Sequence, residues 1–236
     1  MTIPVMDQLV NLRDVADAVP AITPGILLRS DAPYAGDRHD YRVTWPPRTV
    51  VDLRDLTESD SPNPLAQAAR VHHLPLLDGR ARDVSAMPPS LGELYLTMLC
   101  EPAASRLVAA IELIATGPAP VLVHCAAGKD RTGVTIALAL ALVGIDDEAI
   151  TADYALTAAA MDDVHARLGT THAHLTADVL GSIPEDFMTA APESIGAVLA
   201  EWRSRRSGAL GWYLDHGGSA RTVALLRERL LLVSTG

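Results

Sequence analysis

The chain has 236 residues, of which 49% are hydrophobic and 20% charged, a composition typical of a folded globular protein with a sizeable core. Its formal net charge of −10 disfavours nucleic-acid binding, because phosphate backbones are bound by basic surfaces. The longest apolar run, 134–145, is shorter than the ~20 residues that a membrane-spanning helix needs. The N-terminal residues lack the basic and apolar regions of a secretion signal, and two cysteines are too few for a disulfide framework. We therefore expect a cytoplasmic protein without an integral membrane segment.

Four short runs rich in valine, leucine and isoleucine predict buried strands, since each is bounded by proline, glycine or aspartate; they cover residues 25–30, 48–55, 70–77 and 120–125. Between the last two, residues 90–117 are apolar at helical spacing, and Pro102 divides them into two helices. Further helices are predicted over 132–143, 147–168, 192–206 and 219–232. Strands linked by helices and followed by a helical run indicate the α/β fold class, with a sheet flanked by helices. No repeat or linker divides the sequence, so we expect a single domain over residues 1–236.

The segment VHCAAGKDRTG, residues 123–133, follows the last predicted strand and leads into a predicted helix. Small residues at 126–128 allow the backbone to curl so that successive N–H groups point at one centre, and such a nest at a helix N-terminus binds anions. The same field favours the thiolate of Cys125. Arg131 can return its planar guanidinium over the anion and donate two parallel hydrogen bonds to it. Thiolate, amide nest and arginine together indicate covalent phosphoryl transfer.

Two other interpretations of this segment are less favourable. A cysteine that only packs in the core would lie among apolar neighbours, whereas Lys129, Asp130 and Arg131 follow Cys125 closely. We expect that role for Cys100, which falls on the apolar face of a predicted helix. A nucleotide-binding P-loop requires a glycine five residues before its Gly-Lys pair and a serine or threonine after it. Val123 and Asp130 occupy those two positions, so this motif is excluded.

The stretch HCAAGKDRTG resembles the signature of cysteine-dependent phosphatases, and its Lys-Asp pair before the arginine resembles the atypical bacterial tyrosine/lipid phosphatases, also called triple-specificity phosphatases. Segments 11–15, 24–33, 50–55, 73–78 and 211–231 resemble that family in the same order. The resemblance implies a tyrosine-phosphatase-like fold, in which a central, mostly parallel sheet carries the nucleophile loop between a strand and a helix. It also implies an enzyme with no metal and no cofactor. One departure is that only residues 79–90 stand where relatives can have a long insertion that covers the site.

The resemblance implies specific roles for the residues of this loop. Cys125 would attack phosphorus and carry a phosphocysteine, while Thr132 would hydrogen-bond the sulfur and make it a better leaving group. His124 would order the loop through its ring, and Asp52 and Arg54 would brace it. The phosphoryl oxygens would be bound by Arg131 and by the amides of the loop, which comprises Ala126, Ala127, Gly128, Lys129, Asp130 and Arg131.

Two aspartates are candidates for the general acid, which must protonate the leaving oxygen. Asp78 follows a predicted strand that, if parallel to 120–125, ends at the same edge of the sheet as the loop; this geometry favours it slightly. Asp130 lies in the loop itself. The alternative role of Asp78 is that of a residue in an Asp-Gly turn, and that of Asp130 is an ion pair with Lys129 or Arg13.

The resulting hypothesis is a phosphomonoester hydrolase of the tyrosine-phosphatase class, acting on phosphotyrosine or phosphoserine proteins. Lys129 would add a second cation that favours substrates with extra negative charge, and in the family this accompanies activity on phosphoinositides. An alternative is a phosphatase dedicated to a small metabolite, such as a nucleotide or a biosynthetic intermediate. A third is a phosphate-binding or redox-sensing module without turnover, which the intact Cys125, Asp130, Arg131 and Thr132 disfavour.

Overall fold

A computed structural model of the chain describes residues 7–38, 41–58, 62–77, 88–171 and 185–232. Five strands form one sheet in the order β1-β2-β5-β3-β4. They are β1 (Arg13–Asp14), β2 (Leu27–Ser30), β3 (Thr49–Asp52), β4 (Arg70–His73) and β5 (Val121–His124). All neighbouring strands are parallel except β1 and β2. The expected α/β class with a mostly parallel sheet is therefore confirmed, although each strand is shorter than its apolar run, because the ends of the runs turn into loops.

Nine helices are described, joined in places by short 3-10 turns: α1 (Leu91–Thr97), α2 (Ala103–Thr116), α3 (Asp130–Val143), α4 (Asp147–Ala155), α5 (Met161–Thr171), α7 (Glu185–Met188), α8 (Pro192–Ser204), α9 (Gly208–Asp215) and α10 (Ala220–Leu230). Pro102 separates α1 from α2, as predicted. The predicted helix 147–168 is interrupted by the 3-10 turn η6 (Leu156–Ala160). Cys100 lies beyond the end of α1 and is exposed, so its expected place on an apolar helix face is wrong.

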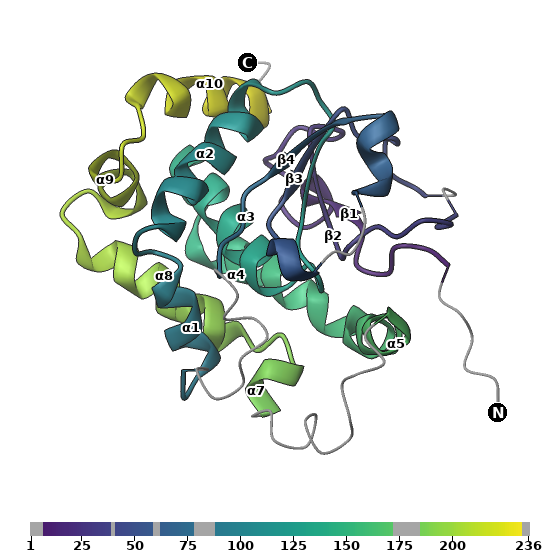
Figure 1. The fold of residues 1–236 in the computed structure, drawn as a ribbon. Coiled ribbons are helices and arrows are strands. Elements are labelled where there is room, and N and C mark those ends of the chain that lie inside the picture. The colour runs from purple at the N-terminus through teal and green to yellow at the C-terminus, as the bar shows by residue number, and fades with distance from the viewer. Residues whose placement is uncertain (1–6, 39–40, 59–61, 78–87, 172–184, 233–236) are drawn as a thin grey trace.

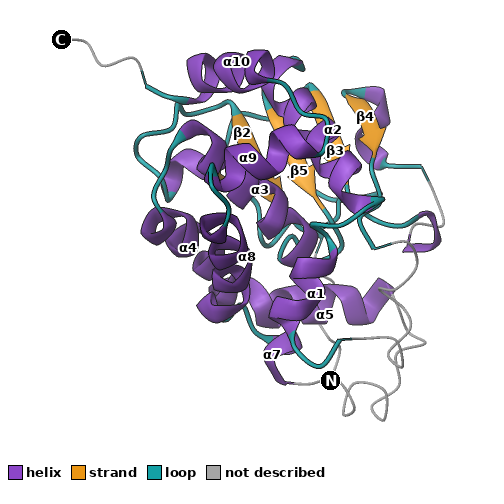
Figure 2. Ribbon diagram, turned by 90° about the vertical axis from the view of Figure 1, so that its left-hand side faces the viewer, coloured by secondary structure: helices purple, strands orange, loops and turns teal. Residues whose placement is uncertain are grey.

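The two faces of the sheet are covered differently (Figures 1 and 2). A thick layer of helices covers one face, and Figure 2 shows α2, α3 and α9 in front of the strands. Because side chains alternate along a strand, Leu27, Val51 and Val123 enter the large core on this side. Leu28, Val50 and Leu122 enter a smaller core on the other face, together with Leu65 of η3 (Pro64–Gln67).

The topology places the end of β5 at the middle of one sheet edge. β5 is the central strand, and β2 and β3 flank it in parallel. The carboxyl ends of parallel strands meet at one edge, where ligands bind in open α/β sheets. These three strands are buried along their whole length, whereas the edge strand β4 is partly exposed. No helix in the described ranges is long and apolar enough to cross a lipid bilayer.

Candidate active site

The loop between β5 and α3 is held by hydrogen bonds to its carbonyl groups. Cys125 follows β5 directly and is 1% exposed. Ala126 O accepts from the amide of Ala32 at 3.0 Å, and Ala127 O accepts from Asn11 Nδ2 at 3.0 Å. Gly128 O accepts from Arg29 Nη2 at 2.9 Å, and Lys129 O accepts from the amide of Gly133 at 2.7 Å. Four consecutive carbonyls are therefore fixed by donors outside the loop.

These hydrogen bonds to the carbonyls also determine where the amide N–H groups of the loop point. In a trans peptide the C=O and the following N–H point to opposite sides of the chain, so the N–H groups of residues 127–130 point away from those donors. None of these four N–H groups has an acceptor in the part of the chain that the structure describes. Asp130 opens α3, and a helix N-terminus adds partial positive charge. These four amides, here called the amide nest, are among those that the sequence analysis expected to bind an anion, and that role stays a prediction.

Gly128 is required by the close approach of this loop to the end of β2. Its φ of +70° lies in the left-handed region, which L side chains rarely adopt. A Cβ on Gly128 would lie 2.4 Å from the carbonyl carbon and oxygen of Ser30. The glycine therefore allows both the turn and the contact with the neighbouring strand.

A buried ionic cluster supports the loop from behind, and the sequence analysis assigned no role to its members beyond the alternative pairing of Arg13 with Asp130. Arg29 is fully buried and pairs with Asp153 through Nη1, while its Nη2 donates a hydrogen bond to Gly128 O. Arg13 Nε also contacts Asp153, at 3.3 Å, and burial and the charge of Arg29 lower the pKa of Arg13 to about 10. Arg13 therefore pairs with Asp153 and not with Asp130. The motifs that contain Arg13 and Arg29 resemble the family, and this was the signal available in the sequence.

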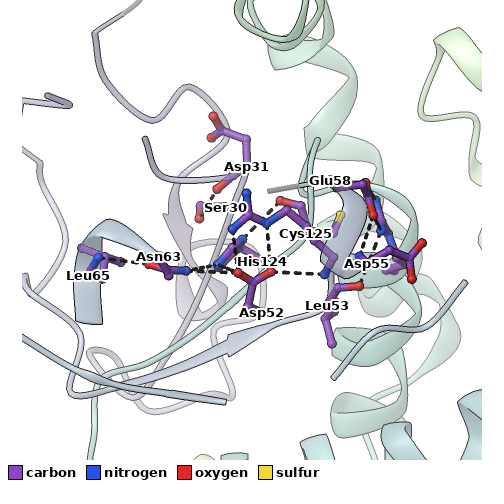
Figure 3. Close-up of polar contacts among 12 residues, drawn as sticks. Ser30, Asp31, Asp52, Leu53, Asp55, Glu58, Asn63, Leu65, His124 and Cys125 are labelled. Atoms are coloured by element: carbon purple, nitrogen blue, oxygen red, sulfur yellow. Dashed lines mark hydrogen bonds and ion pairs between the residues drawn. The ribbon is translucent and has the colours of Figure 1, made fainter. Parts of the chain in front are cut away.

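Arg131 is fixed by a residue that the sequence analysis missed, Glu58 at the end of η2 (Leu56–Glu58). Arg131 Nη2 donates to Glu58 Oε1 at 2.8 Å, and Nη1 pairs with Oε2 (Figure 3). Burial lowers the pKa of Arg131, but the carboxylate of Glu58 raises it by more, so the net shift of the pKa is upward. The same pair lowers the pKa of Glu58 against the effect of burial. Such a bidentate contact restricts the guanidinium plane.

Two polar atoms in the first turn of α3 are buried and have no hydrogen-bond partner among the described residues: Arg131 Nε and Thr132 Oγ1. The expected hydrogen bond between Thr132 and the sulfur of Cys125 is thus not formed here. Buried donors without partners are unfavourable. An oxyanion held by the amides of the loop would provide acceptors for such groups.

His124 contacts Asp52 at the end of β3, Asn63 and the carbonyl of Cys125 (Figure 3). Its expected role in ordering the loop stays a prediction. Its Nε2 lies 2.9 Å from Asn63 Nδ2 and 3.5 Å from Asp52 Oδ2, and its Nδ1 lies 3.2 Å from Cys125 O. Arg54 donates to both oxygens of Asp52, at 2.9 and 2.7 Å. Burial lowers the pKa of His124, although Asp52 opposes this effect. Asp52 and Arg54 therefore form a buried ion pair beside His124, and their expected role in bracing the loop stays a prediction.

Asp130 and Lys129 lie at the start of α3. Asp130 Oδ1 accepts from the hydroxyl of Tyr95 at 2.7 Å and lies 3.4 Å from Lys129 Nζ, which fits the predicted ion pair. The ammonium of Lys129 donates to the backbone carbonyls of Phe187 and Thr189, at 2.6 and 2.8 Å. In this state it contacts the chain next to α7 and not the amide nest, whereas the sequence analysis expected a second cation in the pocket.

The other candidate acid, Asp78, lies outside the described residues. Its preceding strand, β4, runs parallel to β3 and β5, so the strand direction on which its candidacy depends is confirmed. In the ranges that are described, no group of three or more histidine, cysteine, aspartate or glutamate side chains could hold a metal ion.

Comparisons with known proteins agree with this geometry. A model of the tyrosine phosphatase family matches residues 4–232. The chain is similar to the triple specificity protein phosphatase PtpB of Mycobacterium tuberculosis, with 29% identity over 275 residues, covering 94% of this chain and 96% of PtpB. It is also similar to a tyrosine-protein phosphatase of Nostoc commune, with 31% identity over 195 residues, covering 76% of this chain and 65% of that protein. The chain therefore belongs to the tyrosine phosphatase family and is a cysteine-dependent phosphatase.

Proposed function

We propose that the chain hydrolyses phosphomonoesters through a phosphocysteine on Cys125. The observation that carries this proposal is the set of amides at residues 127–130, which lack acceptors in the described structure and lie beside a buried cysteine. The carbonyls of the same four peptide groups, those of residues 126–129, are held on the opposite side, so the donors need not rearrange when charge develops on the phosphoryl oxygens. Fixed donors of this kind are the main source of stabilisation in phosphoryl transfer.

The reaction has two displacements at phosphorus. In the first, the thiolate of Cys125 forms a bond to phosphorus, the bond to the leaving oxygen breaks, and a general acid protonates that oxygen. In the second, water attacks phosphorus, the S–P bond breaks, and the acid takes a proton from the water. Arg131, through Nε, and the loop amides bind the three equatorial oxygens. Thr132 donates its unpaired hydroxyl to the sulfur as it leaves.

Asp130 is the better-supported general acid among the described residues, because it belongs to the loop and its side chain is 24% exposed. Asp78 is the alternative, and substitution of each by asparagine distinguishes them. The variant that lacks the acid shows a steeper dependence of kcat on the pKa of the leaving group, because a poor leaving group needs protonation and p-nitrophenolate does not.

The substrates we propose are phosphotyrosine and phosphoserine proteins and phosphoinositides, on the basis of the name of PtpB and of the Lys-Asp pair in the loop. A small anionic metabolite is the second candidate substrate. With a net charge of −10, most of the protein surface would repel an anion, but a small one could still be attracted by a locally positive pocket. We also propose that the chain acts as one domain over residues 1–236, in the cytoplasm, where the catalytic thiol stays reduced.

The test is an assay of the purified chain in EDTA with p-nitrophenyl phosphate, followed by phosphopeptides, phosphoinositides and nucleotides. We expect turnover in EDTA, inhibition by vanadate, and a loss of at least about a hundredfold in Cys125→Ser, because the nucleophile is removed. Cys100→Ser is the matched control and should retain wild-type activity. Turnover that requires added Mg²⁺ or persists in Cys125→Ser would reject the mechanism, whereas selectivity for one nucleotide would favour the metabolite.

A further inference from the structure

A chain of buried hydroxyl groups ends on Asp130. Tyr95 of α1 donates to Asp130 Oδ1 at 2.7 Å, and the hydroxyl of Tyr154 of α4 lies 2.7 Å from that of Tyr95. The side chains of Tyr95 and Tyr154 are almost completely buried, and the two rings meet edge to face with their centroids 6.2 Å apart. Of the three, Asp130 alone reaches solvent. Two helices distant in sequence thus converge on one carboxylate of the nucleophile loop.

The direction of these hydrogen bonds follows from the number of available hydrogens. Tyr95 has one hydroxyl hydrogen, and a carboxylate is a stronger acceptor than a phenol oxygen. Tyr95 therefore donates to Asp130, and Tyr154 donates to Tyr95. Burial, together with the charge of Asp130 and the neighbouring Tyr154, raises the pKa of Tyr95 well above its usual value. Tyr95 remains a neutral donor throughout the range in which enzymes work.

The two oxygens of Asp130 have different environments as a result. Oδ1 accepts a hydrogen bond from the hydroxyl of Tyr95 and lies 3.4 Å from the ammonium of Lys129, with which it forms an ion pair. Oδ2 has no hydrogen-bond partner within the described ranges of the chain. A protonated carboxyl group carries its hydrogen on one oxygen while the other still accepts. Oδ2 is therefore the oxygen left to carry the proton.

The packing of α3 makes this arrangement possible. A Cβ on Gly133 would lie 2.8 Å from the ring of Tyr154, so only a glycine lets this ring lie directly against the helix that carries Asp130. The glycine that ends the signature stretch thus has a physical role in the contact. Tyr154 in turn donates a hydrogen bond to the hydroxyl oxygen of Tyr95.

We propose that Tyr95 is a positioning residue for Asp130, which fixes Oδ1 as an acceptor and so assigns the transferable proton to Oδ2. This inference rests on the proposed function, with Asp130 as the general acid. Tyr95 donates to Oδ1 both before and after the transfer, because Oδ1 accepts in either protonation state. When the P–O bond breaks, the Oδ2–H bond breaks and its proton passes to the leaving oxygen; the attacking water later returns a proton to Oδ2. The hydrogen bond from Tyr95 need not rearrange in either step.

The experiment measures kcat of Tyr95→Phe with phenyl phosphate and with p-nitrophenyl phosphate as a function of pH. We expect phenyl phosphate turnover to fall at least about tenfold more than p-nitrophenyl phosphate turnover, since general acids contribute about 10²–10⁴-fold to reactions that need them. We also expect the basic limb of the kcat profile to move to higher pH, because the carboxylate loses a donor that favours its charged form. The ratio of the two rates is taken on one sample and does not depend on the fraction of folded protein.

The matched control is Tyr213→Phe, which removes the hydroxyl of another buried tyrosine, on α9, and should leave the ratio and the profile unchanged. In the Asp130→Asn background, Tyr95→Phe should change the ratio no further. An even loss on both substrates, or an unmoved basic limb, would overturn the role of Tyr95. A wild-type ratio in Asp130→Asn would overturn it too, while leaving the cysteine chemistry intact; failure of that chemistry is reported separately by Cys125→Ser.

Discussion

At the scale of single residues, the loop between β5 and α3 depends on positions where a single added atom would change the backbone geometry. Gly128 combines a left-handed φ with a contact that leaves no room for a Cβ, 2.4 Å from the backbone of Ser30. These two constraints can be separated, because Gly36 has a similar φ of +94° and no atom within 4 Å of the position that a Cβ would take. A substitution at Gly36 therefore measures the effect of the φ angle alone, whereas the same substitution at Gly128 adds the effect of the contact with Ser30.

We expect Gly128→Ala to abolish activity and to lower the free energy of unfolding by more than Gly36→Ala does. The φ strain alone costs about 1–2 kcal/mol in each variant, and Gly128→Ala adds the displacement of the strand end that carries Ser30. The measurement is urea unfolding of both variants together with the kcat of each. Equal stabilities and equal rates in the two variants would contradict the account of the loop.

Glu58 acts on the loop through Arg131. Its two carboxylate oxygens accept hydrogen bonds from the two terminal nitrogens of the Arg131 guanidinium, so the plane of that group is fixed before an anion binds. Glu58→Gln replaces one of these acceptors by an N–H group that faces the guanidinium. We expect kcat/KM to fall by about tenfold to a hundredfold, because small displacements of a positioning group cost up to about 10² in rate.

The exposed Glu93 on α1 provides the control, and Glu93→Gln should have wild-type kinetics. Vanadate affinity should weaken in Glu58→Gln in parallel with kcat/KM, since both depend on the orientation of Arg131. Unchanged vanadate affinity in Glu58→Gln would show that Arg131 does not need this carboxylate.

At the scale of secondary-structure elements, the site is built from the ends of β2, β3 and β5 and the start of α3. The pairing of β3 with β5 sets Asp52 opposite His124, and their side chains meet 3.5 Å apart. His124 is completely buried, and burial, opposed by Asp52, lowers its pKa. The folded chain therefore binds a proton on His124 less readily than the unfolded chain does.

The stability should consequently depend on pH in a defined direction. A folded pKa below the unfolded value of about 6.5 means that the unfolded chain binds an extra proton as the pH falls through that value. The contribution of His124 is fully present above about pH 6.5 and decreases below it, by at most about 1.4 kcal/mol per pH unit. Urea unfolding at several pH values should show this slope reduced in His124→Gln. The control is His73→Gln, at an exposed position of β4, which should keep the wild-type slope. A wild-type slope in His124→Gln would show that His124 is not the source of this pH dependence.

The sequence was sufficient for the elements whose signals are local. Four strands, the division of α1 from α2 at Pro102, and the loop between β5 and α3 all follow from apolar runs and breakers. β1 was missed because two residues are too short to form a pattern. α9 was missed because it contains Gly208 and Gly211, which disfavour helices, and is stabilised by tertiary burial of Trp212.

The candidate site divides in the same way. The residues from His124 to Gly133 are contiguous, so their spacing alone indicated an anion site and a nucleophile. Glu58, Tyr95 and Arg29 contact this loop from 35 to 99 residues away in sequence, and no periodicity in the sequence connects them to it. Only the fold brings such partners together, and for this reason their contacts with the loop could be found only in the structure.

At the scale of the whole molecule, the candidate active site is the point where distant parts of the chain meet. Asn11 and Arg29 near the N-terminus hold the loop carbonyls, and Glu58 fixes its arginine. α3, which starts at this loop, is buried along nearly its whole length in the large core. The loop between β5 and α3 is thus connected to the core on one side and to the sheet edge on the other.

The most direct test of the account is to identify the residue that carries the phosphoryl group during turnover. Wild-type protein is mixed with a phosphotyrosine peptide, stopped within one turnover by denaturation, digested and analysed by mass spectrometry. We predict one phosphoryl group on the peptide that contains Cys125, retained in Cys100→Ser and absent from Cys125→Ser. A phosphoryl group on any other residue, or undiminished turnover in Cys125→Ser, would contradict the central claim.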